Sequence, residues 1–211
     1  MNEYLAHEGN TRSQLFTIRI ISRWFNHTGK RISVNTNTSF FTNDRITLRP
    51  LTYDDKHWIL ALQQDALWLK YIGSKNVNNV DDACDYIGKT NAQREEWGYG
   101  LLAVELSETK QPLGVCGLFN RFAFECPDLG FAMLPEARRN GVCFEACQCV
   151  IAWSASQGYR FLTAMTHPEN MASQKLLMRL GFEKQGLYFD KAFPGQHLYR
   201  LEISAPNSAA S

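Results

Sequence analysis

Two adjacent arginines and a glycine lie where a strand pattern passes directly into a helix pattern. Arg138 and Arg139 follow the strand end at 134–135, and Gly141 precedes a strong helix pattern. A helix N-terminus offers unpaired backbone N–H groups and a partial positive charge, and glycine lets a ligand approach the backbone closely. These residues predict a site for an anion of the di- or triphosphate type. An ordinary turn with a solvated arginine pair is the alternative.

The six cysteines are a second residue type with potential chemistry. Cys143 and Cys147 are spaced to share one face of a helix, but no histidine lies within a turn of them and no CxxC motif occurs. We therefore expect no metal site and interpret the cysteines as small buried side chains. No convincing Cys/His pair is present to form a covalent intermediate. Reduced thiols without a secretory signal indicate a cytoplasmic protein.

The surrounding segments predict one mixed domain with a central, mainly antiparallel sheet, an α/β protein of the α+β kind. Periodicity and turn residues indicate helices that begin near 54 and 81, and helices at 141–157 and 170–180. The expected strands lie at 45–49, 99–106, 113–119, 128–134 and 161–165, with two more towards the C-terminus.

Length and charge limit the classes of function. The chain has 211 residues, 45% of them hydrophobic, and a net charge of +1. Near-neutral charge argues against a nucleic-acid partner, and no run of about 18 uncharged apolar residues is present to span a membrane. We expect an N-terminal extension and linker at 1–43, one domain at 44–204 and a flexible tail at 205–211.

The extension is basic, with five basic residues against two acidic ones. Arg12, Arg19 and Arg23 would share a helix face, whereas residues 16–20 alternate as a strand would, and the sequence leaves both open. The extension is interpreted either as a poorly ordered arm or as an element that binds a membrane surface or a partner. Residues 33–42, rich in Asn, Thr and Ser, are expected to form a linker.

Several motifs resemble those of one enzyme family. Arg138-x-x-Gly141-x-Cys143 resembles the R/Q-x-x-G-x-G/A acetyl-CoA loop of the GNAT N-acetyltransferase superfamily. Residues 167–173 (HPENMAS) and 176–182 (LLMRLGF) look like the D-P-E-N-x-A-S and L-G-F segments of its Rim-like branch, the acetyltransferases of ribosomal-protein N-termini. Segments similar to strands of that branch lie at 45–51, 114–118 and 128–131.

This resemblance, which covers about 43–204, implies a GNAT fold with helices on both faces of the sheet. It implies an acetyl-CoA-dependent N-acetyltransferase that moves an acetyl group directly onto a primary amine. The acceptor is a protein N-terminus or a small amine, and the enzyme is a monomer or homodimer. A domain of slightly negative charge suits a cationic amine. The alternative function is a non-catalytic acyl-CoA-binding sensor or scaffold of the same fold.

The resemblance also assigns positions to acetyl-CoA. The pantetheine arm is expected beside the strand that contains Phe131, Met133 and Leu134, bonded to its backbone as an added strand. Asn170 is expected to hold the same arm near the thioester. The pyrophosphate is expected at the backbone of Arg138, Arg139, Asn140, Gly141, Val142 and Cys143. Cys143 replaces the Gly or Ala of the family pattern.

The catalytic assignments need an acid and a base. Leu177 stands where many members carry a tyrosine that protonates the leaving thiolate, so Ser173, one turn earlier, is the substitute; a helix-capping hydroxyl is the alternative for Ser173. An ammonium must lose a proton before it attacks, and Asp128 is the first choice of base. An ordinary strand-end aspartate is the alternative for Asp128. Lesser candidates for the base are Glu125, Glu105 and His167.

Large aromatic residues precede these segments and form a further candidate group. A wall on the acceptor side is one interpretation, and ordinary core packing is the other. The residues concerned are Trp58, Trp68, Tyr71, Trp97 and Tyr99.

Overall fold

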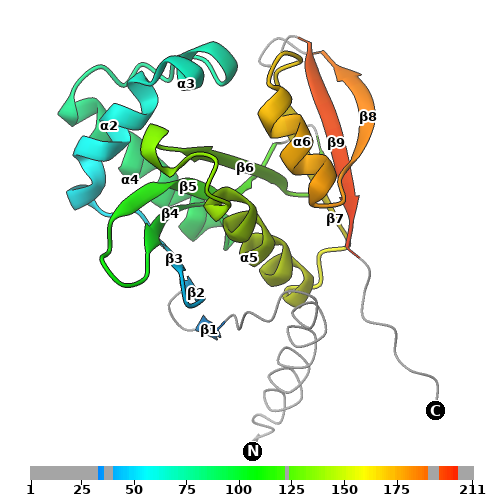
Figure 1. The fold of residues 1–211 in the computed structure, drawn as a ribbon, viewed down its shortest axis with the longest axis horizontal. Helices are drawn as coiled ribbons and strands as arrows, with labels where there is room; N and C mark the ends of the chain where they lie inside the picture. The colour runs from blue at the N-terminus through cyan, green and yellow to red at the C-terminus, as the bar shows by residue number, and fades with distance from the viewer. Residues whose placement is uncertain (1–32, 36–39, 122–123, 190–194, 204–211) are drawn as a thin grey trace, which may run out of the picture.

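The computed structural model describes residues 33–35, 40–121, 124–189 and 195–203 (Figure 1). Within these residues, one sheet has the strand order β1-β2-β3-β4-β5-β6-β7-β9-β8. All neighbouring strands are antiparallel except β6 and β7, which are parallel. In sheet order the strands span Ser33–Asn35, Phe40–Thr42, Ile46–Arg49, Leu101–Leu106, Pro112–Phe119, Asp128–Met133, Phe161–Thr166, Gln196–Glu202 and Glu183–Tyr188.

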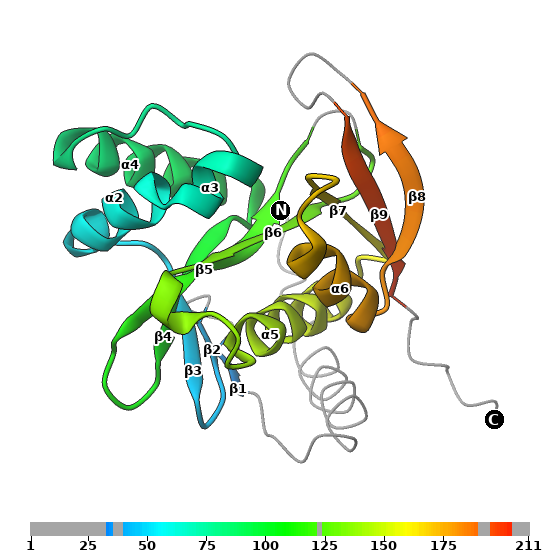
Figure 2. The same ribbon diagram turned by 45° about the horizontal axis from the view of Figure 1, so that its top comes forward.

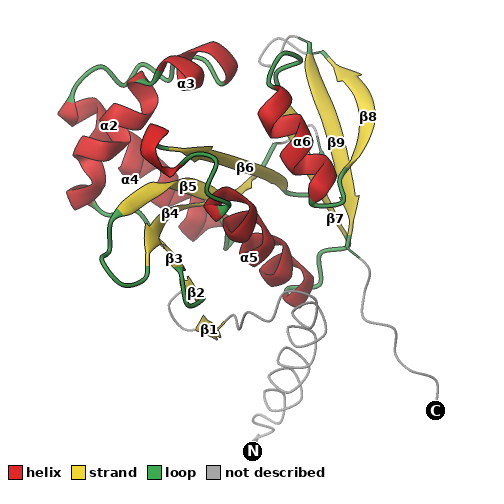
Figure 3. Ribbon diagram, viewed as in Figure 1, coloured by secondary structure: helices red, strands yellow, loops and turns green. Residues whose placement is uncertain are grey.

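Helices cover both faces of this sheet, as Figure 3 shows with helices in red and strands in yellow. The expected α/β fold, with a mainly antiparallel sheet between two helical layers, is confirmed. None of the described helices is long and apolar enough to cross a membrane. Helices α2, α3 and α4 (Lys56–Gln64, Ala66–Tyr71, Val80–Trp97) form one layer, and α5 and α6 (Val142–Ser156, Met171–Arg179) form the other.

Alternation along strand β4 divides the core between these layers. Leu101 and Ala103 pack with the α2–α4 layer, whereas Leu102 and Val104 point the other way and pack with α5 and α6. All four side chains are buried. A strand covered on both faces needs a nearly continuous apolar sequence, which β4 provides.

The sheet extends further towards the N-terminus than the sequence indicates. Residues 33–42, expected as a linker, contribute β1 and β2, which continue the sheet from the edge of β3. An unpaired strand edge presents backbone N–H and C=O groups that readily take another strand, so pairing here needs no strong side-chain pattern. The basic segment 1–32 and the tail 204–211 lie outside the described residues, so the predictions for them stay predictions.

The helical segment expected to begin near 54 is divided by Asp65. A 3-10 turn at Tyr53–Asp55 leads into α2, and Asp65 then adopts an extended conformation (φ −63°, ψ 138°) before α3. Its side chain accepts hydrogen bonds from the N–H groups of Leu67 (3.0 Å) and Trp68 (3.2 Å). Asp65 is therefore the N-cap of a short separate helix that the sequence analysis did not find.

A buried ion network joins β3, β4 and the start of the helical layer. Both oxygens of Asp55 accept from the Arg49 guanidinium at 2.7 and 2.8 Å, and Glu105 accepts from Arg49 Nε at 2.7 Å. Asp55 also accepts from the Thr52 N–H and the Trp58 indole, both at 2.8 Å. Burial acts to raise the pKa of Asp55, but these hydrogen bonds outweigh it and hold the pKa below its usual value.

Replacing Asp55 by asparagine tests this network. Asp55→Asn should lower the free energy of unfolding by about 3 kcal/mol at neutral pH, because it removes one charge from a buried pair. The stabilisation should be present above the unfolded pKa of about 3.9 and be lost as pH falls through the lower folded pKa. Urea unfolding at several pH values measures both effects.

The neighbouring carboxylate provides the control. Asp54 is exposed, and Asp54→Asn should change the stability by less than about 0.5 kcal/mol. Equal effects of the two substitutions would show that the network does not stabilise the fold.

Candidate active site

Strands β6 and β7 separate almost as soon as they meet. Their parallel ladder consists of the single pair Asp128↔Thr163, whereas β5–β6 and β7–β9 each register six pairs. Beyond that pair the two strands diverge, so the gap between them opens towards their carboxyl ends at Met133 and Thr166. Figure 2 shows α5 and α6 beside the two strands. A crevice at the carboxyl ends of neighbouring parallel strands is a common ligand site in α/β proteins.

A cleft of about 500 Å³ occupies this region. It brings together four of the residues predicted to bind acetyl-CoA or to be the first-choice catalytic groups, namely Asp128, Phe131, Asn170 and Ser173. Met133 and Leu134 are instead core residues, 7% and 5% exposed, and are not part of the cleft lining. Loop 138–143 also lies outside the lining; it begins five residues beyond the end of β6 and leads into α5.

Loop 138–143 has the backbone of an anion site at the start of α5. Gly141 is the N-cap with φ 87°, and Arg139 has φ 63°, both in the left-handed region that favours glycine. The Val142 N–H is already bonded to the Asn140 side chain at 3.2 Å. Within the described residues, the N–H groups of Arg139, Gly141 and Cys143 make no hydrogen bond.

Arg138 holds the loop in place. Its Nε donates to the Met133 carbonyl at 3.0 Å, and its Nη2 donates to Asp65 at 2.5 Å. The Arg138 N–H is also used, in a bond to the Pro135 carbonyl at 3.3 Å. The N–H groups of Arg138 and Val142, expected to bind the pyrophosphate, therefore already make hydrogen bonds inside the protein. Arg139, the other arginine of the pair, is exposed.

A third arginine, missed by the sequence analysis, supports the same loop from β3. Arg45 Nη2 donates to the Asn140 carbonyl at 2.9 Å, and Nη1 pairs with Glu145 in the first turn of α5 at 3.1 Å. Arg45 thus adds positive charge beside the helix N-terminus. Its position depends on a contact across 95 residues of sequence, and no local pattern indicates it.

Asp128 lies at the point where the strands meet. Its side chain is 2% exposed, and Oδ2 accepts from Arg121 Nε at 2.5 Å. Burial raises the pKa of Asp128, and the charge and hydrogen bond of Arg121, with the hydroxyl of Thr163, oppose that rise only in part. Asp128 is a carboxylate whose pKa is shifted towards neutrality on the wall of a cleft, which is typical of functional sites.

Asn170 and Ser173 begin helix α6 on the opposite wall. Asn170 Oδ1 accepts from the Ser173 N–H at 3.1 Å, so Asn170 is the helix cap. The Ser173 hydroxyl does not cap the helix, and it makes no hydrogen bond within the described residues. Leu177, which stands at the tyrosine position of the motif, is fully buried in the core.

Helix α3 spans the mouth between the two walls. Asp65 at its N-terminus holds Arg138 of loop 138–143, and Lys70 near its C-terminus pairs with Glu169 at 3.1 Å. Tyr71 packs against His167 with ring centroids 5.6 Å apart. Helix α3 is therefore joined to the loops that follow both β6 and β7.

The lesser candidates for the base are distributed differently. His167 lines the cleft and accepts from the Glu169 N–H at 3.1 Å. Glu105 is 4% exposed within the Arg49 network and is not part of the cleft lining. Glu125 is exposed and likewise outside the lining.

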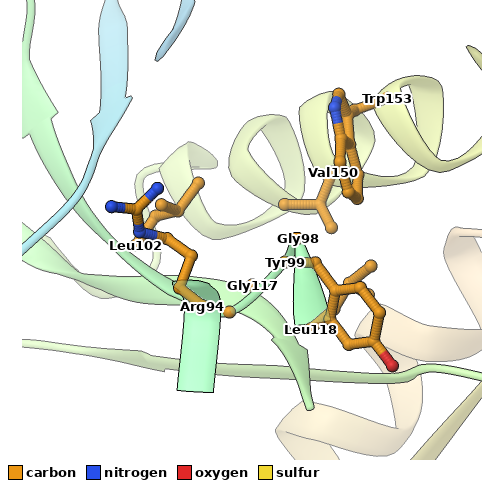
Figure 4. A pocket seen from close by; sticks show the side chains of 9 residues that line it. Arg94, Gly98, Tyr99, Leu102, Gly117, Leu118, Val150 and Trp153 are labelled. Atoms are coloured by element: carbon orange, nitrogen blue, oxygen red, sulfur yellow. The ribbon is translucent and has the colours of Figure 1, made fainter. Parts of the chain in front are cut away.

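The expected aromatic wall is divided among three places. Trp68 and Tyr71 line the cleft, whereas Trp58 donates to Asp55. Tyr99 packs edge-on against Trp97 at 6.3 Å. Tyr99 also lines a separate cavity of about 30 Å³. Figure 4 shows it there with Arg94, Val150 and Trp153. A cavity of that size has room for about one water molecule and none for an acceptor.

Three of the six cysteines fit the interpretation as small buried side chains, whereas Cys84, Cys126 and Cys143 are only partly buried. Cys116, Cys147 and Cys149 are buried, and Cys116 and Cys147 approach to 3.8 Å between sulfurs without a disulfide. Burial raises the pKa of Cys149 to about 12, which keeps it a thiol. Within the described ranges, no group of three or more His, Cys, Asp or Glu residues is placed to hold a metal ion.

The sequence analysis missed several polar residues of the cleft lining, among them Tyr86, Gln93, Arg121 and Lys75. Tyr86 and Gln93 are two turns apart on one side of α4, a spacing that could have indicated a shared face. Burial raises the pKa of Tyr86 to about 12. Arg121 lies just after β5, close to the start of β6 in the hairpin register. Lys75, in the loop between α3 and α4, gives no periodic signal.

Comparison with known proteins agrees with this geometry. The chain is 29% identical over 152 residues to the uncharacterized N-acetyltransferase YoaA of Bacillus subtilis, covering 68% of this chain and 82% of YoaA. It is 29% identical over 150 residues to the uncharacterized N-acetyltransferase p20 of Bacillus licheniformis, covering 70% and 84%.

Solved structures share the fold at low identity. An acetyltransferase from Agrobacterium tumefaciens superposes with a TM-score of 0.69 at 20% identity, covering 82% of this chain and 99% of that one. The microcin C7 self-immunity acetyltransferase MccE, in complex with acetyl-CoA and AMP, gives 0.66 at 18%, covering 76% and 94%. The ribosomal L7/L12 acetyltransferase RimL gives 0.65 at 14%, covering 82% and 95%.

The family model described as acetyltransferase (GNAT) domain matches residues 45–183. That match begins at Arg45 and includes loop 138–143 and α6, so it contains both walls of the cleft. The chain therefore belongs to the GNAT acetyltransferase family and is an acyltransferase.

Proposed function

We propose that the protein transfers an acetyl group from acetyl-CoA directly to a primary amine, either a protein N-terminus or a small-molecule amine. The observation that carries the proposal is the parallel pair β6–β7, which separates after one residue pair beside a cleft lined by Asp128 and Ser173. MccE, a structural neighbour with bound acetyl-CoA, supports the choice of donor. Membership of the Rim-like branch rests on segments 167–173 and 176–182 and is part of the proposal.

The binding of acetyl-CoA follows from the groups at the open end of the strands. The N–H groups of Arg139, Gly141 and Cys143 and the positive end of α5 suit the pyrophosphate. The edge of β6 that faces β7 has backbone groups beyond Asp128 that an extended pantetheine arm can bond, in the way that a peptide adds to a sheet. Asn170, at the opposite wall, is placed to bind the same arm.

The chemistry needs two protons to leave the acceptor nitrogen and one to reach the leaving sulfur. Asp128 takes the proton of the acceptor ammonium, and the neutral nitrogen attacks the thioester carbonyl carbon. The C–N bond forms, the C–S bond breaks, and the coenzyme A thiolate leaves. The nitrogen then gives up its second proton to become the amide, and the thiolate takes that proton to become the thiol. Ser173, whose hydroxyl makes no hydrogen bond within the described residues, donates a hydrogen bond to that sulfur. The alternative function, an acyl-CoA sensor without chemistry, is not favoured for a chain that belongs to this family.

Binding of the donor is tested by thermal unfolding with acetyl-CoA. At 100 times its Kd the ligand adds about 2.7 kcal/mol, which for a domain of this size is a rise in Tm of roughly 5–10 °C. Gly141→Val should abolish the rise, because a β-branched residue at φ 87° distorts the loop. Gly158→Val, at φ 83° in open space beyond α5, imposes the same strain elsewhere and should retain the rise. A normal rise in Gly141→Val would refute this location of the pyrophosphate.

The role of Asp128 predicts a particular pH dependence. The carboxylate must be ionised to act as a base, so kcat/KM should fall as pH drops through a pKa above the usual 3.8. Asp128→Asn should lower kcat/KM by about 100-fold and remove that acidic limb, while the acetyl-CoA thermal shift persists. An unchanged acidic limb in the variant would assign the base to another residue, with His167 the next to test.

The role of Ser173 is separable from binding. Ser173→Ala should lower kcat several-fold with little change in KM for acetyl-CoA, because the hydroxyl acts on the leaving sulfur rather than on the bound donor. Ser156, which donates to the Trp153 carbonyl at the end of α5, provides a matched Ser→Ala control away from the cleft. A rate equal to that of the unaltered enzyme would remove Ser173 from the mechanism.

A further inference from the structure

The acceptor side of the cleft carries more positive than negative charge. Three cations, Lys70, Lys75 and Arg121, line the cleft with one carboxylate, Asp128. Lys70 pairs with Glu169 outside the lining, and Arg121 pairs with Asp128. Among the described residues, Lys75 has no acidic partner within 4 Å. One ammonium is therefore left uncompensated in the cleft.

Lys75 stands on an ordered loop. Val77, two residues later, is 8% exposed and packs in the core under α2–α4. The Asn78 N–H donates to Asp82 at 2.8 Å, and the Asn78 carbonyl accepts from Gln64 at 3.2 Å. These contacts hold the loop backbone at the cleft wall, while the Lys75 side chain itself is exposed.

Lys75 and Arg121 face the same space. Burial, and then the charge of Arg121, lower the pKa of Lys75, so each cation disfavours the other. An anion near both relieves that repulsion, and the guanidinium of Arg121 has a donor geometry that suits a carboxylate. The positive charges of Lys75 and Arg121 therefore favour a negative group at their end of the cleft.

The anion in question is distinct from the phosphates of acetyl-CoA. Arg121 is bonded to Asp128 at the start of β6, whereas loop 138–143 follows the far end of that strand. Six residues of strand separate the two by about 16 Å.

We propose that the acceptor carries a side-chain carboxylate on the same molecule as its α-amine, and that Lys75 and Arg121 bind this carboxylate beside the base that Arg121 holds. An α-amino acid with an acidic side chain and a peptide with an acidic residue next to its N-terminus share this chemistry. The proposal rests on the proposed acetyl transfer and names its substrate class. It replaces the expectation of a purely cationic amine, because charge in the cleft decides recognition and the net charge of the domain does not.

Matched acceptors test the proposal with the full chain and acetyl-CoA. Thiol release is measured with free glutamate against glutamine, with the peptides Ala-Glu-Ala against Ala-Gln-Ala, and with spermidine as a cationic amine. Within a pair the two acceptors differ only in the carboxylate. We expect kcat/KM for the acidic member to exceed that for its amide by about tenfold or more, and the pair with the larger rates identifies a free amino acid or a peptide as the source.

Variants of Lys75 link the preference to this residue. Lys75→Gln should bring the ratio of kcat/KM for the acid over its amide close to one, and Lys75→Arg should keep the ratio. Lys75→Glu should bring the ratio below one and favour spermidine as the acceptor. Lys89→Gln, on the exposed part of α4 outside the cleft lining, is the control and should leave the ratio unchanged. The acetyl-CoA thermal shift should persist in all four variants, which shows that they are folded and bind the donor.

Two results would overturn the proposal in distinguishable ways. Equal rates for acid and amide acceptors, or a ratio that survives Lys75→Gln, refute carboxylate recognition and leave acetyl transfer intact. A normal acetyl-CoA thermal shift without thiol release from any acceptor counts against the proposed acetyl transfer itself, and the substrate class falls with it.

Discussion

Two parallel strands that share one residue pair must leave most of their facing backbone groups to other partners. In this chain the constraint acts on β6 and β7, whose ladder is limited to Asp128↔Thr163. Buried backbone donors and acceptors are costly to leave unbonded, so such a gap is stable only when it holds water or a ligand. The flanking antiparallel ladders, six pairs on each side, keep the two strands in place while the gap between them stays open. Loop 138–143, α6 and the cleft all take their positions from this separation.

One ion pair, between Asp128 and Arg121, lies at the junction of the two strands and includes the proposed catalytic base. Asp128 is almost fully buried, and Arg121 pairs with it from the adjoining hairpin. Burial alone would favour a neutral carboxyl, while the guanidinium favours the carboxylate, and the balance raises the pKa without reaching the values of an isolated buried acid. A residue so placed responds strongly to a charge that enters the cleft. The charges of the uncompensated Lys75 and of the proposed acceptor carboxylate act on the same balance between the neutral and ionised forms of Asp128.

The sequence predicted best where the signal was local. The apolar periodicity of 142–156, the Gly141 turn and the alternation of the last strand are short-range patterns, and the structure contains them. The sequence predicted least where position depends on distant chain segments. Arg45, Arg121 and Lys75 reach their sites through pairings and loops that no periodicity encodes. Helix α3 was missed because a single aspartate, Asp65, divides it from α2, and β1 and β2 were missed because backbone pairing at an open edge demands little of the side chains.

Helix α3 is only six residues long, and isolated helices of that length are unstable in water. Its persistence depends on Asp65, which caps it and holds Arg138, and on Lys70 and Tyr71, which contact Glu169 and His167. The helix is therefore a local folding unit whose opening free energy is set by its neighbours rather than by its own sequence. Amide hydrogen exchange in these few residues reports whether the loops after β6 and β7 are both in place. The exchange rates of α3 therefore measure how completely the site is assembled.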